Sequence, residues 1–233
     1  MSVTKVLEQL RALGTIEARL ALVEHGAREP MFGVRFGDLD ALAQRHRGDH
    51  ELACALWTSE NIDARLLAMK IADPERMSEV ALDRWLGDLR WHMSVDLFVS
   101  ALVVRSRHAH QKAEQWREAP GELEGRAGWT LVVHLARDLG IPDPWFAGCV
   151  DELVAGIHSA PNYKREAMNS ALIAIGGYRE NLRARALRAA DRIGTVEVDH
   201  GDNYCETPDA RRYIEAMIDR SERGRRPRRG AAR

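Results

Sequence analysis

The residues with the clearest capacity for chemistry lie in the stretch RWHMSVD, residues 90–96. It ends in Asp96 and is followed by LFVSALVV, so this carboxylate stands beside an apolar wall and close to Trp91 and His92. An acid in such a place needs a cationic partner, because desolvation penalises an unpaired charge. Asp96 is therefore either a surface or helix-capping carboxylate, or an acid that stabilises positive charge developing on a substrate.

A second candidate is Arg126, in GELEGRAGWTLVVHLARDLG, three residues before Trp129. Residues three apart share a helix face, so the two side chains are expected to lie together. A guanidinium there is half of a salt bridge or a side chain that reaches out to solvent. The alternative is a phosphate clamp, because the guanidinium fork matches phosphate oxygens.

Further basic residues begin the segment NYKREAMNSALIAIGGYREN. Lys164 and Arg165 stand at the start of its predicted helix, where they would face a duplex backbone or form part of a solvated surface. Elsewhere, VEVDHGDNYCETPDA holds Asp199, His200, Asp202 and Cys205 within seven residues. Their spacing is not that of a structural zinc site, and acids that cap turns explain the segment, so we expect no metal.

The chain has 233 residues, of which 45% are hydrophobic and 30% charged, a composition typical of a globular protein with a sizeable core. It contains no Gly-rich phosphate loop, HExxH or GxSxG motif, and we expect no cofactor. No apolar run approaches the ~20 residues that span a bilayer. The amphipathic start and the three cysteines favour a cytoplasmic protein with no membrane partner.

Charge is unevenly distributed along the chain. Residues 220–233 hold seven arginines and one glutamate, a local charge of +6, so the net charge of −1 leaves −7 for the remainder. We expect this Arg-rich tail to be disordered, either as a binder of polyanions or as a solubilising end. The acidic remainder restricts any nucleic-acid surface to a local basic stripe.

Hydrophobic periodicity predicts an all-α protein. Helix pairs recur about every 35–40 residues, which favours a curved α-solenoid of HEAT-like repeats over residues 1–194, with a compact helical bundle as the alternative. A C-terminal loop and helix follow over residues 195–219. Gly176-Gly177 predicts a helix end. The predicted helices are Thr4–Leu13, Ile16–Ala27, Phe36–His46, His50–Trp57, Ile62–Ile71, Met77–Leu89, Ser94–Arg105, Ala109–Glu118, Leu123–Leu139, Pro144–His158, Tyr163–Gly176, Glu180–Ile193 and Pro208–Arg223.

Four segments in this order resemble the AlkD-like HEAT-repeat DNA glycosylases, a family of DNA alkylation repair enzymes: FGVRFGDLDALAQRH, ELACALWTSENIDARLLAMKIAD, RWHMSVDLF and EGRAGWTLVVHL. The resemblance covers about residues 30–190. It implies a curved solenoid whose concave basic face holds double-stranded DNA, bound by a single copy of the chain. It also implies hydrolysis of the N-glycosidic bond of bulky or cationic alkylpurines, without metal or nucleotide and without flipping the base into a pocket.

Residue by residue, the resemblance places the catalytic aspartate on Asp96 and the DNA-binding arginine of the catalytic site on Arg126. The carboxylate would stabilise the sugar cation, and the guanidinium would hold a backbone phosphate. The two aromatic positions of the family fall on His92 and Ser170. Trp91 and Trp129 are candidates for a replacement aromatic surface.

Three functions follow from these observations. The first is a DNA glycosylase that acts through Asp96 and Arg126. The second is a HEAT-repeat protein that binds branched or damaged DNA without catalysis, which the missing aromatic pair favours. The third is a solenoid that binds protein, which the acidic remainder of the chain favours.

Overall fold

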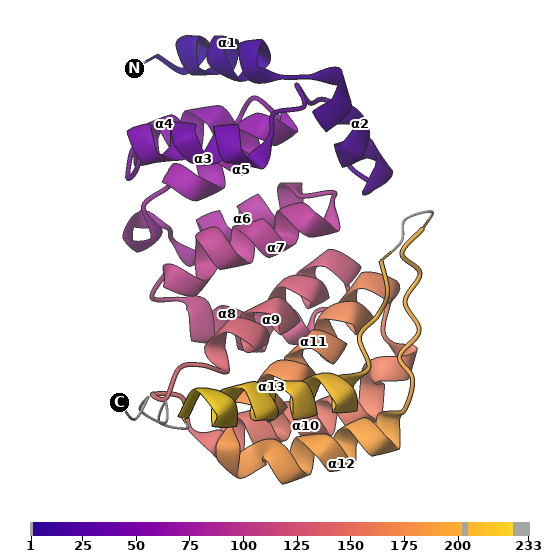
Figure 1. The fold of residues 1–233 in the computed structure, drawn as a ribbon. Helices are drawn as coiled ribbons and strands as arrows, with labels where there is room; N and C mark the ends of the chain where they lie inside the picture. Colours follow the sequence, from indigo (N-terminus) through magenta and orange to yellow (C-terminus); the bar gives the residue numbers. More distant parts are fainter. Residues whose placement is uncertain (1, 202–204, 226–233) are drawn as a thin grey trace, which may run out of the picture. The chain divides into compact units, whose positions relative to one another are not determined.

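The structure, a computed structural model, describes residues 2–201 and 205–225, and these residues form helices, most of which are joined by short turns (Figure 1). Within these ranges there is no β-strand, so the prediction of an all-α protein is confirmed. No helix of the described residues is long and apolar enough to cross a membrane. The α-helices are α1 (Val3–Leu13), α2 (Ile16–Glu24), α3 (Phe36–Arg45), α4 (His50–Trp57), α5 (Ile62–Ile71), α6 (Glu79–Asp88), α7 (His92–Ala101), α8 (Ala109–Glu118), α9 (Glu122–Leu135), α10 (Asp143–Gly156), α11 (Asn162–Tyr178), α12 (Arg183–Ile193) and α13 (Ala210–Arg225). Short 3-10 helices are η1 (Pro74–Arg76), η2 (Val103–Arg105), η3 (Ile157–Ser159) and η4 (Glu180–Leu182). Longer connections precede α3 and α13.

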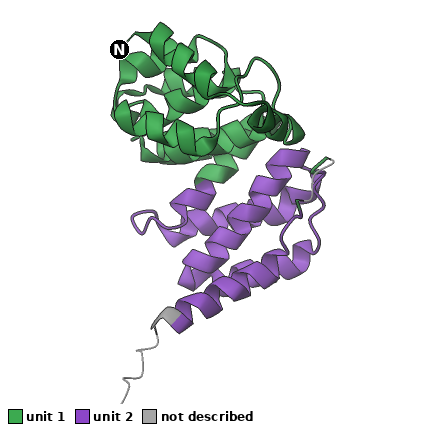
Figure 2. Ribbon diagram, turned by 45° about the horizontal axis from the view of Figure 1, so that its top comes forward, with its two compact units in different colours: residues 1–131, 200–205 green, residues 132–199, 206–233 purple. Residues whose placement is uncertain are grey.

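The helices form two compact units, coloured separately in Figure 2. Unit 1 comprises residues 1–131 and 200–205, and unit 2 comprises residues 132–199 and 206–233. The division falls inside α9, so this helix contributes its first ten residues to unit 1. Each unit has its own buried core and is described separately.

In unit 1, α5 packs against α3, α4 and α7. Its central apolar side chains, Leu66, Leu67, Ala68 and Met69, are almost completely buried. Trp57, at the end of α4, stacks on Trp85 of α6 with ring centroids 4.0 Å apart. The indole nitrogen of Trp57 donates to Asp88 at 2.8 Å, so this aromatic pair connects α4 with the end of α6.

A buried carboxylate fixes the loop between α2 and α3. Asp63, on the first turn of α5, is fully buried and accepts hydrogen bonds from the backbone N–H groups of Phe32, Gly33 and Val34 at 2.6, 3.1 and 2.8 Å. Gly33 adopts φ +81°, and a Cβ there would lie 2.7 Å from the Thr15 carbonyl oxygen. Only glycine fits this position without a backbone shift.

In unit 2, α13 packs against α11 and α12. This contact explains why Gly176-Gly177, predicted to end a helix, instead lies inside α11, which continues to Tyr178. A Cβ on Gly176 would lie 2.7 Å from Ile214 Cδ1, and one on Gly177 would lie 2.2 Å from Met217 Cε. The glycine pair therefore permits close packing of α13, and the predicted helix end was wrong.

The C-terminal helix also extends further than expected. α13 includes Arg220, Arg223 and Arg225, so the first six residues of the predicted disordered tail are helical. Ile214 and Met217 of α13 face α11. This packing anchors the helix, which continues into the part of the sequence where arginines dominate the composition. The remainder of the predicted tail, residues 226–233, lies outside the described residues.

Candidate functional site

The helix that carries Asp96 begins earlier than the sequence indicated. α7 begins at His92, with Trp91 in an extended N-cap conformation, and Ser94 is already inside the helix. The Ser94 hydroxyl donates to the Trp91 carbonyl oxygen at 2.5 Å instead of capping the helix. The predicted start at Ser94 was therefore wrong, and Asp96 lies in the second turn.

This shift changes the interpretation of Asp96. The favourable field of a helix N-terminus fades within its first turn, so capping does not explain the acid. His92 and Asp96 are four residues apart on α7, which places both side chains on the same face of the helix. Of the two, Asp96 bonds to α9, through Arg126 and Thr130.

Asp96 and Arg126 form a two-point ion pair. Arg126 Nε donates to Asp96 Oδ1 at 2.8 Å, and Arg126 Nη2 donates to Oδ2 at 2.6 Å. The Thr130 hydroxyl donates to Oδ1 at 3.3 Å. The Asp96 side chain is 38% exposed, whereas that of Arg126 is only 8% exposed. The structure thus brings the two principal candidates from the sequence into direct contact, with the acid on the solvent side.

Helix α9 supplies both partners of this carboxylate. Arg126 and Thr130 are one helical turn apart and therefore face α7 together. Gly128 allows α9 to approach α8 closely, because a Cβ there would lie 2.0 Å from the backbone nitrogen of Arg117. Close packing of α9 on the backbone of α8 therefore helps to fix the position of α9, and with it the position of Arg126 opposite Asp96.

The positive charge of Arg126 largely neutralises the negative charge of the Asp96 carboxylate. Two parallel charge-assisted hydrogen bonds are the strongest geometry for an arginine–carboxylate pair. Since Arg126 is almost buried, solvent screens this pair less than an exposed one. The arrangement can hold α7 against α9 and present a partly exposed carboxylate edge to a ligand.

The two tryptophans proposed as aromatic surfaces are both buried. Trp91 is 4% exposed, and its indole nitrogen donates to the His25 carbonyl oxygen at 2.7 Å. Trp129 is fully buried, and its indole nitrogen has no hydrogen-bond partner among the described residues. Neither ring presents an open face for stacking. His92 is half-buried, with its ring edge-on to Trp91 at 6.5 Å between centroids.

The other predicted DNA contacts, Lys164, Arg165 and Ser170, lie on α11 in unit 2. Arg165 uses its guanidinium to bind backbone carbonyl oxygens, those of Ala160 and Glu197, at 2.8–3.3 Å. It therefore ties the segment after α12 to the start of α11. Lys164 is half-buried, and burial lowers its pKa below the ordinary range. Ser170 is half-buried in the middle of the helix.

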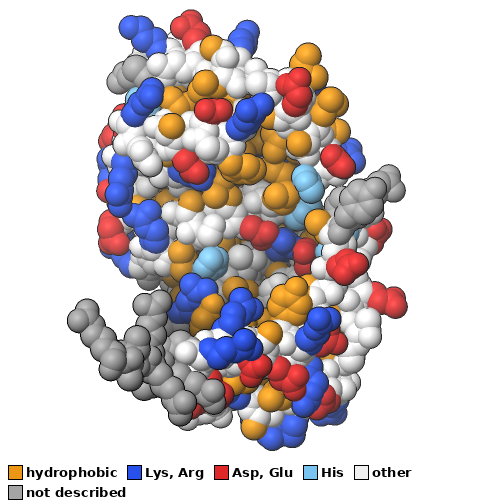
Figure 3. Space-filling view, viewed as in Figure 1, with side chains coloured by type: hydrophobic (Ala, Val, Ile, Leu, Met, Phe, Trp, Pro, Cys, Tyr) orange, Lys and Arg blue, Asp and Glu red, His pale blue; other side chains and the backbone are white. Residues whose placement is uncertain are grey.

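Charges of both signs are mixed on the surface. On the face seen in Figure 3, Lys and Arg side chains alternate with Asp and Glu rather than forming one continuous basic area. Exposed pairs such as Arg185–Asp151 and Arg211–Asp191 show the same mixing. Within residues 2–201 and 205–225, no three His, Cys, Asp or Glu side chains gather in a group that could hold a metal ion. Asp202 lies outside the described residues.

Comparisons with known proteins agree with the fold. The family model described as "DNA alkylation repair enzyme" matches residues 6–214, which is most of the chain. The chain therefore belongs to this family. It is 28% identical to the uncharacterized protein Lin0241 of Listeria innocua over 217 residues, or 91% of this chain and 95% of that protein. It is 27% identical to the uncharacterized protein Lmo0209 of Listeria monocytogenes over 219 residues, or 92% and 96% of the two chains.

A solved structure is similar over nearly the whole length, with a TM-score of 0.87, 28% identity and 95% of each chain covered. That protein belongs to a family described as related to the HEAT-like repeat DNA glycosylases, with affinity for branched DNA structures. The HEAT-like helical repeat fold predicted from the sequence is therefore confirmed.

Proposed function

We propose that this protein recognises DNA with a branched or locally unpaired structure and does not hydrolyse glycosidic bonds. The observation that carries the proposal is the two-point pairing of Asp96 with Arg126. At the position where the family resemblance puts a catalytic acid, both carboxylate oxygens already bind a cation. The proposal extends to this chain the branched-DNA affinity described for the structurally similar protein.

The size of the competing electrostatic effects supports this choice. At an effective dielectric constant of about 20, a carboxylate stabilises a unit positive charge 4 Å away by about 4 kcal/mol. The Arg126 guanidinium binds that carboxylate, and its repulsion of a sugar cation offsets part of this stabilisation. Less net stabilisation remains for a glycosidic transition state, so the pair serves better as a rigid DNA-contacting element than as a catalyst.

The residues at the family's aromatic positions support the same function. The family's aromatic positions are His92 and Ser170 here, and the neighbouring tryptophans Trp91 and Trp129 are buried. These indoles therefore do not form walls that would hold the sugar of a damaged nucleotide. An imidazole at the start of α7, beside a fixed guanidinium, suits contact with backbone phosphates.

The test is a comparison of affinities for DNA of identical base composition. Fluorescence anisotropy would measure the Kd for a three-way junction, a four-way junction, a single-strand flap and a linear duplex. The series would be repeated at several salt concentrations, because phosphate contacts make log K fall linearly with log salt. We expect a branched form to bind at least tenfold more tightly than the duplex. Equal affinities at all salt concentrations would refute the proposal.

A second candidate function is base excision through Asp96. The specific observation in its favour is the 38% exposure of the Asp96 side chain, which leaves part of the carboxylate accessible to a ligand. A phosphate that draws Arg126 toward itself would free the acid. Release of alkylated purines that depends on Asp96 distinguishes this function from recognition alone.

A further inference from the structure

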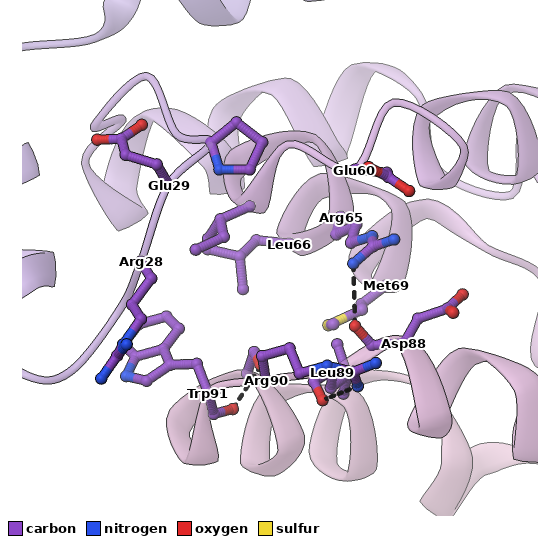
Figure 4. Close-up of a pocket in the computed structure, with 13 residues that line it drawn as sticks. Arg28, Glu29, Glu60, Arg65, Leu66, Met69, Asp88, Leu89, Arg90 and Trp91 are labelled. Atoms are coloured by element: carbon purple, nitrogen blue, oxygen red, sulfur yellow. Dashed lines mark hydrogen bonds between the residues drawn. The ribbon is translucent and has the colours of Figure 1, made fainter.

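Unit 1 contains a cavity of about 650 Å³ beside the first turn of α7 (Figure 4). Its walls come from the loop between α2 and α3, from α5, and from the connection between α6 and α7. We propose that this cavity receives a single unpaired nucleobase, with its phosphate held by arginines at the opening. The inference rests on the proposed function and names the feature of branched DNA that the protein recognises.

The floor of the cavity is apolar. Leu66 and Met69 of α5 and Leu89 of the α6–α7 connection contribute side chains that are at most 4% exposed. Ile62 and Trp91 also line the cavity. A flat, weakly hydrated nucleobase matches such a floor, and burying one base against apolar or aromatic groups stabilises a complex without demanding a particular sequence.

Cationic groups stand at the opening. Arg28 is exposed and, among the described residues, has no ion-pair partner. Arg90 is also exposed, and its guanidinium donates to the Leu89 carbonyl oxygen at 2.8 Å, which holds it at the rim. Arginine is well suited to this role, because its fork can bind two oxygens of one phosphate.

Two of the three acids that line the cavity are already engaged. Glu29 accepts from Arg19 at 2.6 Å and from the Met31 backbone N–H at 2.9 Å, and this N–H is the main reason that the Glu29 pKa is lowered. Asp88 accepts from the Trp57 indole.

The third acid, Glu60, lies beside Arg65 and across the opening from Arg28 (Figure 4). The Glu60 backbone adopts φ 58°, which is uncommon for a residue other than glycine. The side of the opening near Arg28 therefore keeps its positive character.

The cavity and the Asp96–Arg126 pair lie on opposite flanks of α7. Trp91 and Ser94 line the cavity together with α5, whereas Asp96 meets α9. A helix with its side chains is about 10 Å across. Since DNA advances about 3.4 Å per nucleotide along a strand, a strand that touches the pair reaches the cavity about three nucleotides further on. One strand can therefore occupy both features.

The same chemistry would bind a free mononucleotide, so the experiment tests both an unpaired base in DNA and a free nucleotide. Duplexes would carry a single bulged 2-aminopurine, a bulged abasic site or no bulge. The Kd for each duplex is measured by anisotropy, and the environment of the probe is followed by its fluorescence. Equilibrium dialysis with dAMP tests the free nucleotide.

Two variants act on the cavity and one serves as a control. Arg28→Glu reverses the charge at the opening, and Ile62→Trp fills it. The control, Arg47→Glu, changes another exposed arginine. Arg47 lies in the turn after α3, next to Gly48, whose N–H donates to the Ile71 carbonyl oxygen at the far end of α5. Thermal melting checks that each variant is folded, and Arg28→Glu keeps the test decisive if Ile62→Trp fails to fold.

For wild type, we expect the base-bearing bulge to bind about tenfold more tightly than the abasic bulge, a gain typical of one stacked base. Arg28→Glu and Ile62→Trp should remove this advantage and the fluorescence change, whereas Arg47→Glu should keep both. Equal binding of the two bulges by wild type overturns the inference, even if junctions are still preferred to linear duplex. If no DNA binds, the proposed function fails, and equilibrium dialysis then tests the cavity by itself. Binding of dAMP that is lost in Arg28→Glu supports a free-nucleotide site. No binding of dAMP overturns the inference that the cavity receives a nucleobase.

Discussion

Arg126 donates one hydrogen bond to each carboxylate oxygen of Asp96, across a sequence separation of 30 residues. The two residues that the family resemblance places at catalytic positions are thus bonded to each other, and they join α7 to α9. A pair of this kind fixes the direction of the carboxylate and reduces its ability to stabilise another cation.

The pair should contribute measurably to stability. Asp96→Asn leaves the nearly buried Arg126 without its counter-charge, so we expect the free energy of unfolding to fall by about 2 kcal/mol, less than for a fully buried pair because the acid is partly exposed. A double-mutant cycle with Arg126→Gln, measured by urea denaturation, should give a coupling energy of about 1–2 kcal/mol.

The matched control for this cycle is Asp151→Asn. Asp151 also binds one arginine, Arg185, through both oxygens, but its side chain is 66% exposed. Exposed pairs contribute little, so the loss should be at most about 0.5 kcal/mol. Similar losses for the two substitutions would show that the Asp96–Arg126 pair has no special role.

The close contact of α9 with α8 predicts a strong effect at Gly128. A Cβ at this position meets the Arg117 backbone, which cannot move aside as a side chain can, so Gly128→Ala should destabilise unit 1 by about 1–3 kcal/mol. Gly148, inside α10, has open space around its Cα, and Gly148→Ala should instead stabilise the protein by about 0.5–1 kcal/mol. Thermal unfolding of both variants measures the difference, and the same sign for both would contradict the packing described here.

The buried Asp63 carboxylate should be essential to the loop that borders the cavity. Asp63→Asn replaces one acceptor oxygen by a donor that faces backbone N–H groups, so we expect a loss of about 2–3 kcal/mol. Hydrogen exchange should show loss of protection at the Phe32, Gly33 and Val34 amides. Unchanged protection at these amides would mean that the carboxylate does not hold the loop.

The stability of the protein should depend on Lys164 at alkaline pH. Burial lowers the pKa of this amine, and Glu152 only partly offsets the effect, so the unfolded chain binds the proton more tightly than the folded chain. Folding is penalised below the lowered pKa, and stability is regained as pH rises from there towards the ordinary lysine value. Lys164→Gln should therefore be more stable than wild type at pH 7, with a difference that shrinks as the pH increases. The exposed Lys5→Gln serves as control. A difference that grows with pH would reverse the predicted sign.

Much of the secondary structure could be predicted from the sequence, because local signals determine it. The bounds of α4 and α5 agree with the prediction, and the side chains of Asp49 and Asn61 cap these helices. The errors arise where tertiary contacts override a local rule. Gly176-Gly177 has the composition of a helix end, yet it lies inside α11 because α13 needs the space.

The site was only partly predictable for a similar reason. Asp96 and Arg126 are recognisable in the sequence, but their mutual contact depends on how α7 and α9 pack. Thr130 was missed, although it stands four residues after Arg126 and therefore on the same face of its helix. The cavity draws on three separate segments, and Arg28, Arg65 and Arg90 share no periodic pattern that would indicate their proximity.

The most direct test measures base release and DNA binding in the same samples. Duplex and junction DNA containing N-methylated purines would be incubated with wild type or Asp96→Asn, with a known alkylbase glycosylase as positive control, and the free bases separated and counted. We predict release no faster than spontaneous depurination with either protein, while wild type still binds the junction at least tenfold more tightly than the duplex. Release that requires wild-type protein and is abolished by Asp96→Asn would show instead that the carboxylate paired with Arg126 is catalytic.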